Sequence, residues 1–365
     1  MPPSDALTND SRPSIPGETT TNVSSRDARY ALRKTMMLLQ AKVRSRTLPC
    51  NCFLDEQPSE RVPLGALQRM RLQANDAKLV VNPSFHYQDA DDPPEEIAQR
   101  ALPLGGFLRG HPVAWVKDPG VGLWMPFWAR GEWADVLRSL EPGGPAPSFL
   151  RPAMRNTLAA ANVFVPDDYG QSRQAQWVKI CEIAQSQFRT QGYAVVRDLV
   201  HPFQLGAMRR YYRELVAGGG LPLGDFQVAQ RYQLGNEVLA SFFHPQLATL
   251  VSRIAAEPVK PSYVYLASYR PGADLQRHVD REQCEFSISL LVDYMPDPDG
   301  PCGWPLFMEN PAAPEMVHAA DLGIGDALIY RGRELIHYRQ PLPEGHQSTS
   351  FFLHYVREDF AGRLW

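Results

Sequence analysis

The chain has 365 residues, 44% hydrophobic and 21% charged, which is long enough for one large or two ordinary domains with a sizeable core. Its net charge of −3, from 37 basic and 40 acidic residues, gives no indication of binding to nucleic acid or to an anionic membrane. Residues 1–21 lack the apolar core of a signal peptide, and no run of about 18 apolar residues follows. The five cysteines form no CxxC pair. We therefore expect a cytoplasmic protein with reduced thiols and no membrane span.

The first 150 residues are predicted to form two parts. Residues 1–23 are rich in Pro, Ser and Thr, which is typical of a disordered tail. Residues 24–150 are predicted to be a helical or mixed region of unknown role. It begins with a basic helix, expected to present a solvated face, with a partner- or membrane-binding helix as the alternative. Five aromatic residues in this region are expected to pack in a core or to line a substrate surface. They are Trp115, Trp124, Phe127, Trp128 and Trp133.

A Pro- and Gly-rich run at 141–152 (EPGGPAPSFLRP) is typical of a linker, so residues 151–365 are predicted to be a separate domain. The apolar patterns predict helices at 177–189, 203–217 and 245–256. They also predict strands at 193–199, 262–269, 286–294, 327–330, 335–339 and 348–356. Short strands with regular turn residues indicate a sandwich or barrel, so the fold class is α+β with flanking helices.

The strongest chemical signal is the pair His278 and Asp280 in the run YRPGADLQRHVD. On a strand, residues i and i+2 point to the same face, so an imidazole and a carboxylate would converge there. His337, near the end of the later run GDALIYRGRELIHYR, is the best candidate for a third ligand. Two histidines and one carboxylate leave three open positions on an octahedral metal, as in non-haem Fe(II) oxygenases, whereas structural zinc sites are closed. The alternative is a surface His–Asp pair and an unrelated core histidine.

These two runs, together with YAVVRDL at 193–199, resemble the Fe(II)/2-oxoglutarate-dependent oxygenase superfamily. The nearest likeness is to its prolyl-hydroxylase-like and phytanoyl-CoA-hydroxylase-like members, over residues 171–360. The resemblance implies a double-stranded β-helix (jelly roll, cupin-like) core with flanking helices and an N-terminal extension. It also implies Fe(II) as cofactor, 2-oxoglutarate as cosubstrate and O₂. The expected reaction is oxidation of a C–H bond, and the carboxylate of Asp280 argues against halogenation.

In the superfamily a basic residue on the strand after the distal histidine grips the remote carboxylate of 2-oxoglutarate. Here His346 and Gln347 stand in that place. Arg339, which shares a strand face with His337, is the predicted substitute because its guanidinium can make two parallel hydrogen bonds to a carboxylate. A hairpin would place Arg339 opposite Gln347. The residues predicted to bind 2-oxoglutarate are therefore Arg339, Ser348, Tyr269 and Gln347.

Three alternatives stay open at this point. The first is an oxygenase with the same iron ligands that does not use 2-oxoglutarate. The second is a non-catalytic metal-binding module. The third is a protein or peptide hydroxylase that docks through the N-terminal region. The expected partner is a small-molecule or peptide substrate, with no nucleic acid and no membrane, and the sequence assigns no oligomeric state.

Overall fold

The computed structural model describes residues 52–54, 78–89, 93, 95–104 and 110–364. These residues belong to a compact unit spanning Thr47–Trp365, while Met1–Arg46 forms the other unit of the chain. The tail and the basic helix expected before residue 47 lie outside the described residues. The boundary expected near residue 150 stays a prediction. Within the described residues, no helix is both long enough and apolar enough to cross a membrane.

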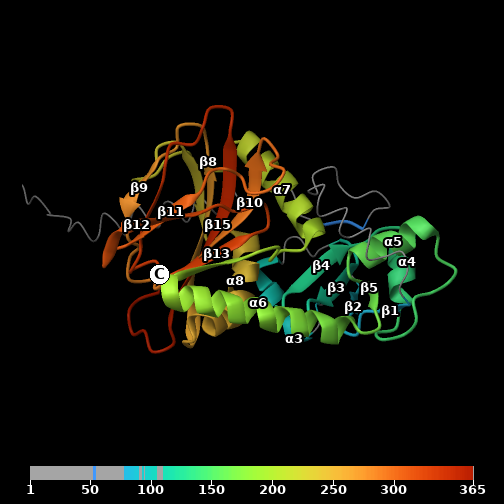
Figure 1. Cartoon of the computed structure of the whole chain (residues 1–365). Helices are drawn as coiled ribbons and strands as arrows, with labels where there is room; N and C mark the ends of the chain where they lie inside the picture. The colour runs from blue at the N-terminus through green and yellow to red at the C-terminus, as the bar shows by residue number, and fades with distance from the viewer. Residues whose placement is uncertain (1–51, 55–77, 90–92, 94, 105–109, 365) are drawn as a thin grey trace, which may run out of the picture. The chain divides into compact units, whose positions relative to one another are not determined.

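The chain before residue 167 builds a three-stranded sheet, β2-β3-β4, and a strand pair, β1-β5, with short helices between them (Figure 1). The elements are β1 (Leu79–Val81), β2 (His86–Gln88), α3 (Glu95–Ala101), η1 (Leu102–Leu104), β3 (Val113–Lys117), β4 (Trp124–Trp128), α4 (Glu132–Arg138), α5 (Pro152–Ala160) and β5 (Phe164–Pro166). The five aromatic residues grouped by the sequence are all buried on β3, β4 and α4. They therefore pack in a core and do not form a substrate surface.

The rest of the chain contains three long helices and two antiparallel sheets, so the predicted mixed α+β class is confirmed (Figure 1). The helices are α6 (Tyr169–Gln191), α7 (Pro202–Ala217) and α8 (Val238–Ala255). The larger sheet has the order β6-β13-β10-β15-β8-β7, with β6 (Tyr193–Val196), β13 (Ala327–Tyr330), β10 (Phe286–Met295), β15 (Gln347–Arg357), β8 (Val259–Tyr269) and β7 (Arg231–Gly235). The smaller sheet has the order β12-β11-β14-β9, with β12 (Ala313–Ala320), β11 (Leu306–Asn310), β14 (Ile336–Arg339) and β9 (Leu275–His278).

Helix α8 begins seven residues before the predicted start at Pro245. The carboxylate of Glu237 accepts hydrogen bonds from the backbone N–H groups of Leu239 and Ala240, which caps the helix. Pro245 lies inside the helix, where it removes only one backbone hydrogen bond. The cap and the buried apolar side chains of the first turns offset that loss, so the helix continues through the proline.

The two sheets enclose a core to which both contribute side chains. Tyr269 and Leu291 belong to the larger sheet, and Leu275, Leu306 and Met308 belong to the smaller sheet. The opposite face of the larger sheet packs on α8, which in turn packs on α6.

Serine side chains also point from the larger sheet into this inter-sheet space. They are Ser287 and Ser289, which alternate with outward apolar residues on β10, and Ser348 and Ser350, which flank Thr349 on β15. A row of hydroxyl groups in an otherwise apolar core marks the place where a polar ligand would fit.

Candidate active site

The structure brings the three predicted metal ligands together. His278 on β9 and His337 on β14 lie opposite each other in the antiparallel pairing, with ring centroids 4.3 Å apart. Strand β9 ends at His278, so Asp280 lies beyond the strand on which it was expected. Its Oδ1 is nevertheless 3.8 Å from Nε2 of His278 and 3.5 Å from Nε2 of His337. The ligand atoms of all three lie within 4.8 Å of one another, close enough to hold a metal ion.

Both imidazoles are held in the orientation that a metal requires. Nδ1 of His278 is 2.8 Å from the carbonyl oxygen of Gln276, and Nδ1 of His337 is 2.9 Å from that of Leu335. A carbonyl oxygen can only accept, so each Nδ1 donates its hydrogen. In the neutral rings, Nε2 therefore carries the lone pair, and it is this atom that faces Asp280. Backbone carbonyls that fix the tautomer in this way are usual behind metal-binding histidines.

The charges of the three groups depend on one another. Burial and the neighbouring His337 lower the pKa of His278. Burial alone would raise the pKa of Asp280, but the hydrogen bond and charge of His337 outweigh it, so this pKa is lowered. Burial would also lower the pKa of His337, yet Asp280 raises it above the ordinary value. A divalent cation between the three groups would favour the charged carboxylate and the neutral imidazoles.

A second group of metal-binding residue types, Asp280, Cys284 and His354, shares one member with the first. The Cys284 thiol lies 3.0 Å from the hydroxyl of Tyr263, and burial raises the pKa of this thiol to about 12. A thiol that keeps its proton is a poor metal ligand, because thiolate is the form that binds metals. The ligand set that the geometry favours is therefore the predicted one.

Arg339 is a buried cation without an acidic partner within salt-bridge distance in the described part of the chain. Its Nη1 donates to the carbonyl oxygen of Trp304 at 2.7 Å, and its guanidinium carbon lies 4.3 Å from the centroid of the Trp304 ring. Burial lowers the pKa of Arg339. The Tyr269 ring packs against the same Trp304 ring, with centroids 5.1 Å apart, and Ser348 lies opposite Tyr269 in the strand pairing. Three of the four residues predicted for 2-oxoglutarate thus gather around Trp304.

The expected hairpin between Arg339 and Gln347 is wrong. Arg339 pairs with Leu275 in the smaller sheet, whereas Gln347 pairs with Met295 in the larger one. The chain crosses from one sheet to the other between them, so the two residues are not neighbours. Gln347 is exposed, and because it adjoins the inward-facing Ser348 its side chain points to the opposite face. The geometry gives Gln347 no part in the site.

Unpaired polar atoms are concentrated in the space between the sheets. In the described part of the chain, five buried side-chain nitrogen or oxygen atoms lack a hydrogen-bond partner, and four of them face this space. They are Oγ of Ser289, Ser348 and Ser350, and Nε of Arg339. Buried polar groups are normally paired, so an unpaired cluster points to a polar ligand. The sequence signal for Ser289 was the alternation of serine with apolar residues on β10, and for Ser350 it was the i, i+2 spacing from Ser348.

Arg231 also borders the space between the sheets. It lies on strand β7, which the sequence did not predict. It lies opposite Tyr269, and its Nη1 donates to the Tyr269 hydroxyl at 3.2 Å. Its Nε donates to Asp225 Oδ2 at 2.9 Å, so its charge is balanced. Arg231 is therefore paired with an acidic residue. Among the described residues, Arg339 has no acidic partner within salt-bridge distance.

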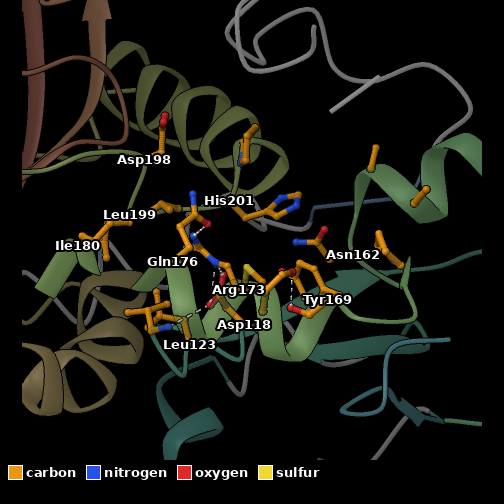
Figure 2. Close-up of a pocket in the computed structure, with 18 of the residues that line it drawn as sticks. Asp118, Leu123, Asn162, Tyr169, Arg173, Gln176, Ile180, Asp198, Leu199 and His201 are labelled. Atoms are coloured by element: carbon orange, nitrogen blue, oxygen red, sulfur yellow. Dashed lines mark hydrogen bonds and ion pairs between the residues drawn. The ribbon is translucent and has the colours of Figure 1, made fainter. Parts of the chain in front are cut away.

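A separate cavity of ≈770 Å³ lies among residues of the β3–β4 turn, the α5–β5 region, α6 and the start of α7 (Figure 2). None of the three metal-ligand candidates lines it. Its Arg173 donates from Nε to Asp118 Oδ2 at 3.0 Å, so these charges balance each other. Nδ1 of His201 accepts from the N–H of Phe203, and burial lowers the pKa of His201 to about 4. These groups hold neighbouring elements together, and the metal ligands remain the better candidate site.

No protein-family model and no curated protein matches this sequence. Solved structures are similar to about half of it. A Pseudomonas putida prolyl-4-hydroxylase is 16% identical over 49% of this chain and 99% of its own, with a TM-score of 0.40. The epimerase SnoN, solved with Fe³⁺, alpha ketoglutarate and nogalamycin RO, is 14% identical over 51% and 87%, with a TM-score of 0.42. HygX from Streptomyces hygroscopicus, solved with nickel, 2-oxoglutarate and hygromycin B, is 12% identical over 50% and 89%, with a TM-score of 0.38.

Proposed function

We propose that the chain is an Fe(II)- and 2-oxoglutarate-dependent dioxygenase that oxidises a C–H bond of a small molecule or peptide derivative. One observation carries the proposal. The Nε2 atoms of His278 and His337 and a carboxylate oxygen of Asp280 converge at an inter-sheet space that holds a buried, uncompensated cation. In this proposal the two sheets are the two halves of a double-stranded β-helix.

The donor set suits Fe(II). Two imidazoles and one carboxylate occupy one face of an octahedral ion and leave three positions open, whereas a structural zinc site closes its shell. Bound iron and 2-oxoglutarate supply the oxidation, in which R–H, O₂ and 2-oxoglutarate give R–OH, succinate and CO₂. His278, Asp280 and His337 hold the metal, and the backbone carbonyls behind the two histidines keep their lone pairs aimed at it.

Arg339 is the proposed anchor of the 2-oxoglutarate carboxylate remote from the metal. A buried guanidinium with a free N–H gains most from an anionic ligand, because the surrounding low dielectric strengthens the pairing. The Trp304 ring covers one face of the guanidinium and excludes water from it. Ser348 presents an unpaired hydroxyl beside Tyr269, so it is suited to donate a further hydrogen bond to the same carboxylate.

The test has a binding arm and a turnover arm. Metal-stripped protein is titrated anaerobically with Mn(II) and then with 2-oxoglutarate, and Fe(II)-loaded protein is assayed in air for conversion of 2-oxoglutarate to succinate. We expect binding of 2-oxoglutarate only after metal, and slow succinate formation that is absent in His278→Ala. Metal binding without 2-oxoglutarate binding would instead favour an oxygenase with the same metal ligands that does not use 2-oxoglutarate. Absence of metal binding would reject both.

A further inference from the structure

The two oxygens of the Asp280 carboxylate have different surroundings. Oδ1 faces Nε2 of both histidines, at 3.5 Å from His337 and 3.8 Å from His278. Oδ2 accepts a hydrogen bond from the hydroxyl of Ser287 at 3.1 Å. One oxygen is therefore directed to the proposed metal position, and the other is engaged by the larger sheet.

The Ser287 hydroxyl is itself held by the strand register. Ser287 on β10 lies opposite Tyr330 on β13 and opposite His354 on β15, and it is fully buried. Nδ1 of His354 lies 2.9 Å from the Ser287 oxygen. The single hydrogen of Ser287 goes to Asp280, so His354 is the donor to Ser287. The Ser287 hydroxyl thus links His354 to Asp280, and Tyr330 on β13 is a further hydrogen-bond partner of the same hydroxyl.

The backbone at Gly332 also lies close to Oδ2 of Asp280. The backbone N–H of Asp280 donates to the Gly332 carbonyl at 2.8 Å. A Cβ built on Gly332 would lie 2.9 Å from the Ser287 hydroxyl and would collide with Asp280 Oδ2. Oδ2 therefore has both the Ser287 hydroxyl and the Gly332 backbone beside it, which restricts how far the carboxylate can turn.

We propose that Ser287, oriented by His354, is a positioning residue that keeps Oδ2 of Asp280 away from the metal. Asp280 then binds through Oδ1 alone. A carboxylate that binds through both oxygens would occupy one of the three positions that the cosubstrate and O₂ need. This inference rests on the proposed function. In it, the hydrogen bond from Ser287 on the larger sheet to Asp280 keeps three positions on the metal open.

The decisive comparison is Ser287→Ala against Ser268→Ala. Ser268 is also a buried serine of the larger sheet, but its hydroxyl accepts from Thr349 and has no contact with Asp280. Each Mn(II)-loaded protein is measured for exchangeable metal-bound water by water-proton relaxation, for 2-oxoglutarate affinity by calorimetry, and for Tm.

In Ser287→Ala, Oδ2 loses its donor and turns to the metal. We expect one bound water fewer and about tenfold weaker 2-oxoglutarate binding, as is typical of lost support behind a metal ligand. Ser268→Ala should match the wild type in both.

Two further variants keep the test decisive if Ser287→Ala folds poorly. His354→Phe retains a ring beside Tyr263 and removes only the donor to Ser287, so we expect the same changes with smaller size. Ser287→Thr keeps the hydroxyl and should retain the wild-type water number. Equal water numbers in the wild type, Ser287→Ala and His354→Phe would overturn the positioning role. If wild-type protein binds Mn(II) no better than His278→Ala, the proposed function itself fails, and the two failures are thereby separated.

Discussion

His278 and His337 lie directly opposite each other on antiparallel strands β9 and β14, and each bonds through Nδ1 to the carbonyl two residues before it. This repeated arrangement turns both Nε2 lone pairs to the same point without help from a metal. The backbone register therefore positions two of the three proposed metal ligands, and Asp280, beyond the end of β9, is the third. Sites prepared in this way lose little conformational freedom when the ion binds.

Arg339→Gln is expected to weaken 2-oxoglutarate binding by about 10- to 100-fold, because it removes a charge-assisted pair worth about 1.5–3 kcal/mol. The metal affinity should not change, because Arg339 contacts none of the metal-ligand candidates. Calorimetry on the Mn(II)-loaded protein measures both quantities. Arg333→Gln is the control, because Arg333 is exposed and its nearest acidic partner, Glu285, is 3.9 Å away. If Arg339→Gln kept the full affinity for 2-oxoglutarate, another group would have to bind the remote carboxylate of the cosubstrate.

Gly332→Ala is expected to lower metal affinity by at least tenfold. The new Cβ would lie 2.6 Å from the carbonyl oxygen of Cys284 and would press on Asp280 Oδ2, so the carboxylate must move. Mn(II) titration followed by water-proton relaxation measures the affinity. Gly300→Ala is the matched control, because nothing lies within 4 Å of a Cβ built there. Equal metal affinity in the two variants would show that Asp280 tolerates displacement.

The metal-free protein is expected to lose stability as the pH falls from about 6.5 to about 4. Burial lowers the pKa of His201, of His244 and of His354 to about 4 from the ordinary 6.5. Between these values the unfolded chain binds up to three more protons at these groups than the native chain. This part of the unfolding free energy is complete above pH 6.5, and it is lost as the pH falls toward the folded-state values. The three groups together contribute a slope of at most about 4.1 kcal/mol per pH unit.

Urea unfolding at several pH values measures this slope. His244→Gln retains a donor for the carbonyl oxygen of His354, which Nε2 of His244 contacts at 2.7 Å. The variant should lower the slope by about 1.4 kcal/mol per pH unit, because one titrating group is gone. An unchanged slope would mean that His244 is charged in the native protein.

Asp293→Ala is expected to destabilise the fold by about 3–5 kcal/mol, because it leaves the fully buried guanidinium of Arg209 without its main counter-charge. Arg209 on α7 donates from Nε to Asp293 Oδ1 on β10 at 2.7 Å, which fastens this helix to the larger sheet. Asp297→Ala is the control. Asp297 contacts the same guanidinium, but its side chain is 60% exposed, so the expected cost is about 0–1 kcal/mol. Chemical denaturation that gave equal losses would contradict a role for burial.

Strand prediction succeeded where the pattern was strong and failed where strands depend on their partners. The strand at 327–330 has its predicted bounds, and β10 and β15 differ from theirs by one residue at one or both ends. Strands β7 and β9 were missed as separate strands. Their segments RYQLG and LQRH contain few apolar residues, and their conformation is set by hydrogen bonds to neighbouring strands.

The sequence by itself determined which side chains can hold a metal. His278 and Asp280 are two residues apart, so their convergence is a local matter, and His337 stood out by its strand context. The surroundings of Arg339, the proposed anchor for 2-oxoglutarate, and the contacts of Asp280 were decided only by the tertiary structure. Arg339 and Gln347 are eight positions apart but lie in different sheets, while Ser287 meets His354 through strand pairing. Contacts of this kind depend on the register between strands that are distant in the sequence. The local spacing of residues does not determine that register.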